Sequence, residues 1–296
     1  MIAYHYCGTE GFRCILSTKT LWATHFKYLN DAGEIRRGIE IAKEEAISLR
    51  DVAKIGIEQF YFDQVVRQLG EKASRHVFVV CFSEEGDLLS QWRAYADDGR
   101  GFAIGFDLQR LSERPSPLGM KLSGRVIYNE ADLRKSIRDY LLQHAPNATS
   151  HPAHDDDDAV TANANNQSWG ILSTVARFKH HGFKEERESR IAFVCNLPNE
   201  WTSIEATPMS EINGPIYLSS FDRLDEELPA HRKFRVSTRG IVPYLEWKFD
   251  ADDIAEIRVG PRGNSEQQLS AVRMFLESNG YLHLMDKLVS SEATYC

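Results

Sequence analysis

The sequence lacks the features that define several large classes of protein. No apolar run approaches the roughly 20 residues that a membrane-spanning helix needs. The first ten residues, MIAYHYCGTE, have no positively charged segment followed by a long apolar stretch, so no secretory signal peptide is expected. No glycine-rich phosphate fingerprint follows a predicted strand, which counts against a Rossmann or P-loop site.

Cysteine is scarce and its spacing is uninformative. The five cysteines are odd in number and form no CxxC pair. Cys81 and Cys195 lie inside apolar, strand-like runs, where reduced buried cysteine is common. We therefore expect a cytoplasmic protein without disulfides. The formal net charge of −8 argues against a generally polycationic surface for nucleic acid, although it permits a local basic groove.

Against these absences, residues 80–107 (VCFSEEGDLLSQWRAYADDGRGFAIGFD) are the most informative stretch. Apolar runs at 77–82 and 102–106 predict two buried strands that bracket a polar connection. A rigid scaffold often presents a site on such a connection.

A short helical turn in this connection carries Trp92, Arg93 and Tyr95. Trp92 and Tyr95 are three residues apart and hence neighbours on a helix. We expect Trp92 to pack onto the sheet, whereas Arg93 and Tyr95 are candidates for ligand contact.

Helices and strands are otherwise mixed without strict βαβ alternation, which favours an α+β fold. We predict a single domain over 1–296. Two helical patterns form an insertion at 34–73, opened by a capping box of Asp31 and Glu34. Residues 144–167 are rich in Pro, Asn, Ala and Asp with few large apolar residues, which predicts a mobile surface loop. A final strand is predicted at Tyr281–Val289.

His5 is the first candidate for a site outside the central stretch. It lies in the predicted strand Ile2–Tyr6, where alternation places it opposite to Tyr4 and Tyr6. A satisfied, partly buried histidine is the simpler interpretation of this residue alone.

A second candidate is the charge run FKEERESR at 183–190, which enters a predicted strand at 189–195. If the extended conformation begins at Glu186, then Glu186, Glu188 and Arg190 share one face. Carboxylates so placed could stabilise positive charge developing on a sugar ring. The competing interpretation is a solvated, self-compensating charge run.

The residue types of a metal site occur at His151, His154 and Asp155–Asp158. They lie in the segment predicted to be mobile, without a surrounding scaffold. A solvated acidic loop is therefore expected, and no metal is predicted.

Six pieces of the chain, in order, resemble a known family. They are YHY at Tyr4–Tyr6, LWAT…YLND at Leu21–Asp31, VCFS at Val80–Ser83, QWRAYADDGRGFAIGFD at Gln91–Asp107, FKEERESRIAF at Phe183–Phe193 and RVGP at Arg258–Pro261. On these pieces the chain is identified as a member of the bacterial "domain of unknown function twenty-nine seventy-one" family. Such chains often end in a Ser…Pro-Tyr-Arg-like tail, which here reads SEATYC.

A second resemblance is to ADP-ribosyltransferase folds. It rests on a first strand with a central His, a helix, a strand ending in Thr24, and the Glu-x-Glu of Glu186–Glu188 entering a strand. The resemblance implies an α+β fold with a mixed, mainly antiparallel sheet and helical insertions. It also implies NAD as co-substrate without a metal, and transfer of ADP-ribose to a protein or nucleic acid.

The implied biological context is a bacterial toxin or anti-phage effector, with an antitoxin or chaperone as a further partner and no membrane association. The resemblance assigns Glu188 to stabilising an oxocarbenium-like transition state, Glu186 to assisting the acceptor nucleophile, and His5 to holding a ribose of NAD. Further ligand contacts are expected from Thr24, from Tyr28 or Tyr95 on the nicotinamide, and from Arg93 or Arg190 on the pyrophosphate.

The chain mixes two patterns, because transferases with His on the first strand often lack Glu-x-Glu. The contrasting hypothesis is a non-catalytic module that recognises a nucleotide or a partner protein with the same polar residues.

Overall fold

The computed structural model describes residues 1–30, 32–53, 56–72, 76–114, 116, 120–146, 157–195, 232–237 and 240–295. Its strands are β1 (Ile2–Cys7), β2 (Thr20–His25), β3 (His76–Ser83), β4 (Phe102–Asp107), β5 (Met120–Arg125), β6 (Glu188–Cys195), β7 (Arg232–Ser237), β8 (Gly240–Lys248), β9 (Ile254–Val259) and β10 (Leu288–Ser290). Its α-helices are α1 (Thr9–Thr18), α2 (Ala32–Val52), α3 (Ile57–Lys72), α4 (Leu89–Tyr95), α5 (Leu108–Glu113), α6 (Glu130–His144), α7 (Asp157–Val175) and α9 (Ser265–Ser278). Short 3₁₀ helices are η1 (Phe26–Tyr28), η2 (Asp97–Gly99), η3 (His181–Glu186), η5 (Ala251–Asp253) and η6 (Leu282–Lys287).

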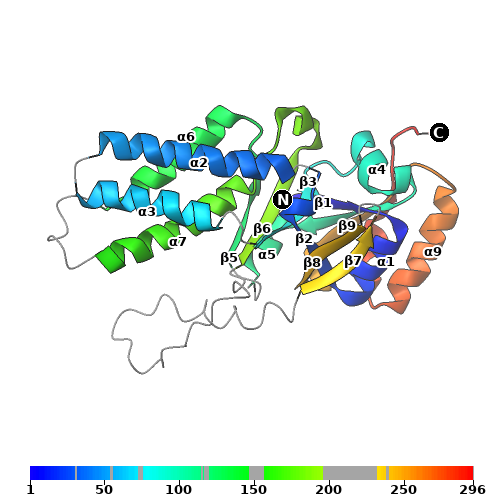
Figure 1. The fold of residues 1–296 in the computed structure, drawn as a ribbon. Helices are drawn as coiled ribbons and strands as arrows, with labels where there is room; N and C mark the ends of the chain where they lie inside the picture. The colour runs from blue at the N-terminus through cyan, green and yellow to red at the C-terminus, as the bar shows by residue number, and fades with distance from the viewer. Residues whose placement is uncertain are drawn as a thin grey trace, which may run out of the picture.

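The described strands form one ten-stranded sheet in the order β10-β9-β4-β1-β3-β2-β8-β7, with β6 beside β3 and β5 beside β6. The pairs are antiparallel except β9 with β10. The predicted α+β class with a mixed, mainly antiparallel sheet is therefore confirmed. Helices α2, α3, α6 and α7 gather at one end of the molecule, and α1 and α9 lie at the other (Figure 1).

Strand β3 separates two apolar cores, which explains its uninterrupted apolar sequence. Phe78, Val80 and Phe82 pack into the core that includes residues of α1 and α9. Val77 and Val79 pack into the core formed with the four-helix end. A strand covered on both faces has no polar alternation, so the predicted buried strand at 77–82 is confirmed.

The ADDG sequence after α4 joins distant parts of the chain. Asp97 and Asp98 adopt left-handed backbone angles (φ 49° and 54°), which short polar side chains tolerate. The Asp97 carboxylate accepts a hydrogen bond from the Thr9 backbone N–H at 2.9 Å, at the start of α1. Asp98 accepts from the Tyr295 hydroxyl at 2.5 Å. A Cβ at Gly101 would lie 2.3 Å from a carbonyl oxygen of β1, so only glycine fits there.

The segment predicted as a mobile loop at 144–167 differs from the structure, because α7 begins at Asp157. Its inward positions include Val160 and Ala164, which are buried at helical spacing against the other helices. Small residues at these positions gave the segment a loop-like composition although its periodicity is helical. Residues 147–156, with His151 and His154, lie outside the described residues.

One other sequence-based assignment needs adjustment. The segment predicted as a strand at Tyr281–Val289 is mostly η6, and strand β10 begins at Leu288. Tyr281 and Leu284 are both buried and three residues apart, which suits a 3₁₀ turn. The helix predicted after Asn129 is confirmed as α6, whose cap Asn129 accepts from the Ala131 N–H at 2.8 Å. The Asp31 cap lies outside the described residues.

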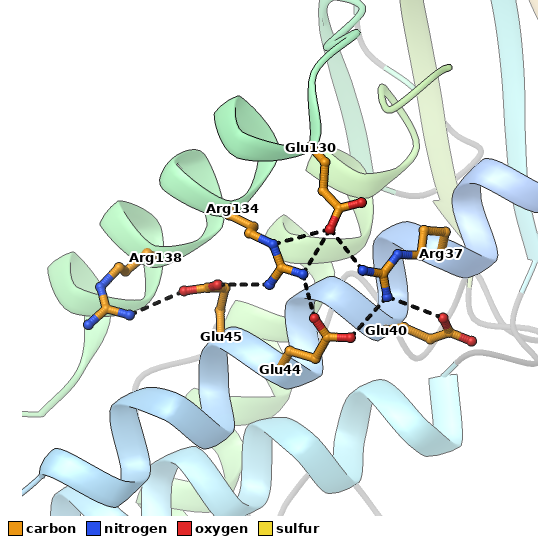
Figure 2. A network of polar contacts seen from close by, with 7 residues as sticks. All are labelled: Arg37, Glu40, Glu44, Glu45, Glu130, Arg134 and Arg138. Atoms are coloured by element: carbon orange, nitrogen blue, oxygen red, sulfur yellow. Dashed lines mark hydrogen bonds and ion pairs between the residues drawn. The ribbon is translucent and has the colours of Figure 1, made fainter. Parts of the chain in front are cut away.

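The helical end is tied together by an ion-pair network between α2 and α6 (Figure 2). Arg134 contacts Glu44 at 2.5 Å, Glu45 at 3.0 Å and Glu130 at 2.8 Å. Arg37 contacts Glu130 from the other helix at 2.8 Å. Surface pairs are individually weak, but one guanidinium shared among three carboxylates has a larger effect when lost.

We predict that Arg134→Met lowers the free energy of unfolding by about 1 kcal/mol at low salt and by less at high salt. Lys135→Met is the control, because Lys135 on the same helix makes only an exposed pair with Asp139. Urea unfolding of both variants checks this. Equal effects of the two substitutions would show that the network does not join the helices.

Candidate functional site

A cavity of about 390 Å³ lies where β1 and β2 diverge. Both strands pair with the same edge of β3, since β6 occupies the other edge along its whole length. β1 meets β3 only at Tyr4 opposite Ser83, and β2 meets it only from Thr24 onward. Between these two contacts the backbones separate, and side chains of β1, α1, β2 and β3 line the space. Its volume is typical of a small-molecule site.

Seven of the eight sequence-predicted site residues line this cavity, and they come from elements far apart in the sequence. They are His5, Thr24, Tyr28, Tyr95, Glu186, Glu188 and Arg190. Arg93 is the exception: it is exposed on α4, and its guanidinium lies 5.9 Å from the ring of Tyr295. Trp92 and Tyr95 lie on the inward side of this helix, whereas Arg93 does not. Arg93 is therefore not positioned to contact a ligand bound in the cavity.

Four charged residues form a buried cluster at one wall of the cavity, each 9% exposed or less. The Lys179 ammonium contacts Glu186 at 2.5 Å and Glu188 at 2.8 Å. Arg190 donates from Nε to Glu188 at 2.6 Å and from a terminal nitrogen to its second oxygen at 3.2 Å. Two carboxylates are thus neutralised by two cations, as burial of charge requires.

The local backbone that builds this cluster differs from the predicted continuous strand. Strand β6 begins at Glu188, whereas Glu186 is the last residue of η3. Arg187 between them has a left-handed conformation with φ 43°. The two carboxylates therefore converge through their shared contact with Lys179 and not through strand alternation.

The two glutamates have pKa values shifted in opposite directions. Burial raises the pKa of Glu186, and the Lys179 ammonium offsets this only in part. Burial also opposes ionisation of Glu188, but the nearby Arg190 and Lys179 outweigh it and lower the pKa of Glu188 to about 2. Burial likewise acts to lower the pKa of Lys179, but the carboxylates raise it above its ordinary value. Glu188 is hence a fixed anion, whereas Glu186 is the more basic carboxylate.

His5 spans the gap between β1 and β3. Its Nδ1 lies 3.0 Å from the carbonyl oxygen of Cys81. Burial lowers the pKa of His5, which favours the neutral ring. A carbonyl only accepts, so Nδ1 carries the proton and Nε2 remains an acceptor. A neutral histidine with this tautomer suits a contact with a ligand hydroxyl.

The two tyrosines predicted to contact a ligand, Tyr28 and Tyr95, differ in how accessible they are. The Tyr95 hydroxyl donates to Glu186 at 3.3 Å and accepts from Asn30 at 3.5 Å. Tyr28 is 41% exposed, and its ring meets His25 edge-on. Tyr28 therefore offers a freer ring face, whereas Tyr95 is held against the acidic cluster.

Two charged cavity residues escaped the sequence analysis, namely Lys179 and Arg235. Lys179 follows α7 with no motif around it, and only the fold brings it to the glutamates. Arg235 lies in β7 between Phe234 and Val236, which are both largely exposed. In the sequence alone, apolar neighbours are expected to face inward, and the alternation would therefore direct Arg235 to solvent. The structure shows the reverse, with Arg235 lining the cavity. No local signal could have selected either residue.

Two absences concern the described residues alone. They hold no group of three or more His, Cys, Asp and Glu side chains arranged for a metal ion. Nor does any helix among them combine the length and apolar character required to cross a membrane.

Comparison with known proteins supports one of the two resemblances. Residues 91–191 match the family described as "Protein of unknown function (DUF2971)", which confirms the first predicted resemblance over this segment. The matched segment carries Tyr95, Lys179, Glu186, Glu188 and Arg190 of the cavity. No curated protein and no solved structure matches the chain.

The pKa of Glu188 leads to a prediction for stability at low pH. The pKa in the folded state is about 2, against an ordinary 4.5. The stabilisation is therefore complete above the ordinary value and is lost as pH falls toward about 2. Between about pH 5 and about pH 3, the stability advantage of the wild type over Glu188→Gln should shrink by about 2 kcal/mol.

Urea unfolding across this pH range measures that advantage. Glu185→Gln is the matched control, since Glu185 is exposed and lies three residues before Glu188. Its stability should run parallel to the wild type. Parallel curves for Glu188→Gln as well would contradict a depressed pKa of Glu188.

Proposed function

We propose that the protein is an NAD-dependent ADP-ribosyltransferase acting on a macromolecular target. The observation that supports this best is the pair of cavity carboxylates that share Lys179 while their pKa values shift apart. Two carboxylates in different protonation regimes can divide electrostatic stabilisation and proton transfer between them.

In the proposed reaction, the bond from the ribose C1′ to the nicotinamide nitrogen breaks. Its electron pair moves to the positively charged ring nitrogen, and neutral nicotinamide leaves. Positive charge then develops on C1′ and the ring oxygen, where the permanently ionised Glu188 stabilises the transition state more than the ground state. A lone pair of the acceptor forms the new bond to C1′, and the acceptor proton passes to Glu186.

The other cavity residues fit supporting roles in this proposal. The Nε2 atom of His5 is an acceptor for a ribose hydroxyl. Tyr28 has an exposed ring that could stack on nicotinamide. Arg190 is already paired with Glu188, so its role is to hold that carboxylate and not to bind pyrophosphate. A toxin or anti-phage context, with an antitoxin or chaperone as partner, extends this proposal by analogy only.

A test uses NAD labelled in its ADP-ribose part, incubated with the full chain and a cell lysate. Wild type should release nicotinamide and transfer label to protein or nucleic acid. Glu188→Gln should slow nicotinamide release roughly 10³-fold, because about 4 kcal/mol of transition-state stabilisation is lost. Glu185→Gln, a neighbouring exposed glutamate, should retain the wild-type rate.

Glu188→Gln also leaves Arg190 and Lys179 with one carboxylate fewer, so its folding must be checked by circular dichroism and urea unfolding. A folded Glu188→Gln protein that works at the wild-type rate would remove Glu188 from the reaction. Absence of nicotinamide release by the wild type would overturn the enzyme proposal.

The proposed proton acceptor gives a separate prediction for the pH profile. Transfer should decline on the acid side as Glu186 becomes protonated, and its raised pKa places this decline above the ordinary glutamate range. In Glu186→Gln, transfer should be low and should no longer show this acid limb. Nicotinamide release in the same variant should fall much less. Equal loss of both activities would contradict the separate role of Glu186.

A non-catalytic nucleotide-binding module is the second candidate, and one observation favours it. Both oxygens of Glu188 already accept hydrogen bonds from Arg190 or Lys179, as in a structural ion pair. Titration calorimetry with NAD separates the two functions, since a module binds NAD without releasing nicotinamide.

A further inference from the structure

The charges around the cavity do not balance. Three cationic side chains line it, namely Lys179, Arg190 and Arg235, against the two carboxylates of Glu186 and Glu188. Lys179 and Arg190 form ion pairs with those carboxylates. The positive charge of Arg235 therefore has no counter-ion among these residues. Within the described ranges, no carboxylate lies within ion-pair distance of Arg235, and burial lowers its pKa.

Arg235 is nevertheless held in a defined position. Its strand pairs with β8, where Arg235 lies opposite Val242. A terminal nitrogen donates to the Thr24 hydroxyl at 2.9 Å, and the guanidinium carbon lies 5.6 Å from the centre of the Trp22 ring. Trp22 is itself packed against Tyr244 at 4.8 Å between ring centres. A planar guanidinium fixed on an aromatic face is well suited to bind an anion.

Two buried donor atoms of these residues have no acceptor among the described residues. They are the Nε atom of Arg235 and the Nε1 atom of Trp22. A half-buried cation with an unused donor is less stable than a fully paired one, and an anion can complete its contacts. Both residues line the cavity, so an anion entering it meets the guanidinium group of Arg235, although these two donor atoms are themselves shielded from solvent. The neutral state of His5, which also faces this charge, leaves Arg235 as the anion-attracting group.

We propose that Arg235, with the Thr24 hydroxyl, is the phosphate-binding subsite of the cavity and that its ligand class is a nucleotide carrying a pyrophosphate. A guanidinium can bind two phosphate oxygens at once, and the hydroxyl adds a neutral donor or acceptor. The identification of this phosphate with the pyrophosphate of NAD rests on the proposed function. The subsite itself rests on the position of Arg235 in the cavity lining, on its contact with Thr24 and on the absence of a carboxylate partner among the described residues.

The test measures binding to the full chain by titration calorimetry, with inorganic pyrophosphate, ADP-ribose and adenosine as probes. Wild type should bind pyrophosphate and ADP-ribose, the latter more tightly. Arg235→Met keeps the aliphatic stem and should weaken both at least about tenfold, with Arg235→Lys between them. Adenosine, which has no phosphate, should bind Arg235→Met as it binds the wild type.

Arg13→Met is the matched control, because it also removes one positive charge but from the exposed surface of α1, where Arg13 pairs with Glu10. It should bind all three probes as the wild type does. Wild-type affinity of Arg235→Met for pyrophosphate and ADP-ribose, or no binding of either by the wild type, would overturn the subsite. The ligand-free melting temperature of Arg235→Met should be no lower than that of the wild type, because an unpaired, half-buried charge is removed. A large drop would make Arg235 a structural residue and would also overturn the assignment.

The outcomes separate this subsite from the transferase proposal. If ADP-ribose binding requires Arg235 but NAD is not cleaved, the subsite stands and the transferase proposal fails. If Arg235→Met cleaves NAD at the wild-type rate with unchanged KM, the subsite fails and the transferase proposal stands.

Discussion

The structure depends on how β3 shares its hydrogen-bonding edges. One edge is occupied along its length by β6, and the other must serve both β1 and β2. Since a strand edge has only one row of donors and acceptors, the two partners meet it at different places and separate in between. The cavity is a direct consequence of this separation. The apolar faces of β3, covered by a core on each side, hold the arrangement rigid.

The same constraint determines the electrostatics of the cavity. β6 displays Glu188 and Arg190 beside β3, and the chain before it returns Lys179 to the two glutamates. These four charges cancel and satisfy one another in a buried setting. Strand β7, the edge strand beside β8, carries Arg235, which has no such partner among the described residues. In this part of the chain the cavity therefore combines an internally neutral wall with one uncompensated cation. That combination suits a ligand with a cationic or polar reacting end and an anionic middle, as NAD has.

Sequence reasoning identified much of the candidate site because two local signals were strong. A histidine within the first strand and paired glutamates before a strand are visible without a fold, and the structure brings His5, Glu186 and Glu188 to one cavity. It did not foresee that Arg93 lies outside the lining of this cavity, since one step along a helix turns a side chain by about 100°, away from the face of Trp92 and Tyr95. It missed Lys179 and Arg235 because their importance arises only from contacts with residues distant in the chain.

The sequence by itself determined the class of fold, most of its elements and the residue types available for chemistry. Hydrophobic periodicity and capping, as in the helix after Asn129, are local properties and can be read from neighbouring residues. Only the tertiary structure decided that residues 157–167 are helical, because packing of Val160 and Ala164 against the other helices stabilises a segment rich in Asp and Asn, which have low helix propensity. It alone decided which charges are neutralised and which one is left over. Ion pairing depends on distances of a few ångströms between segments that the sequence does not relate, and that is where the interpretation of Arg235 originates.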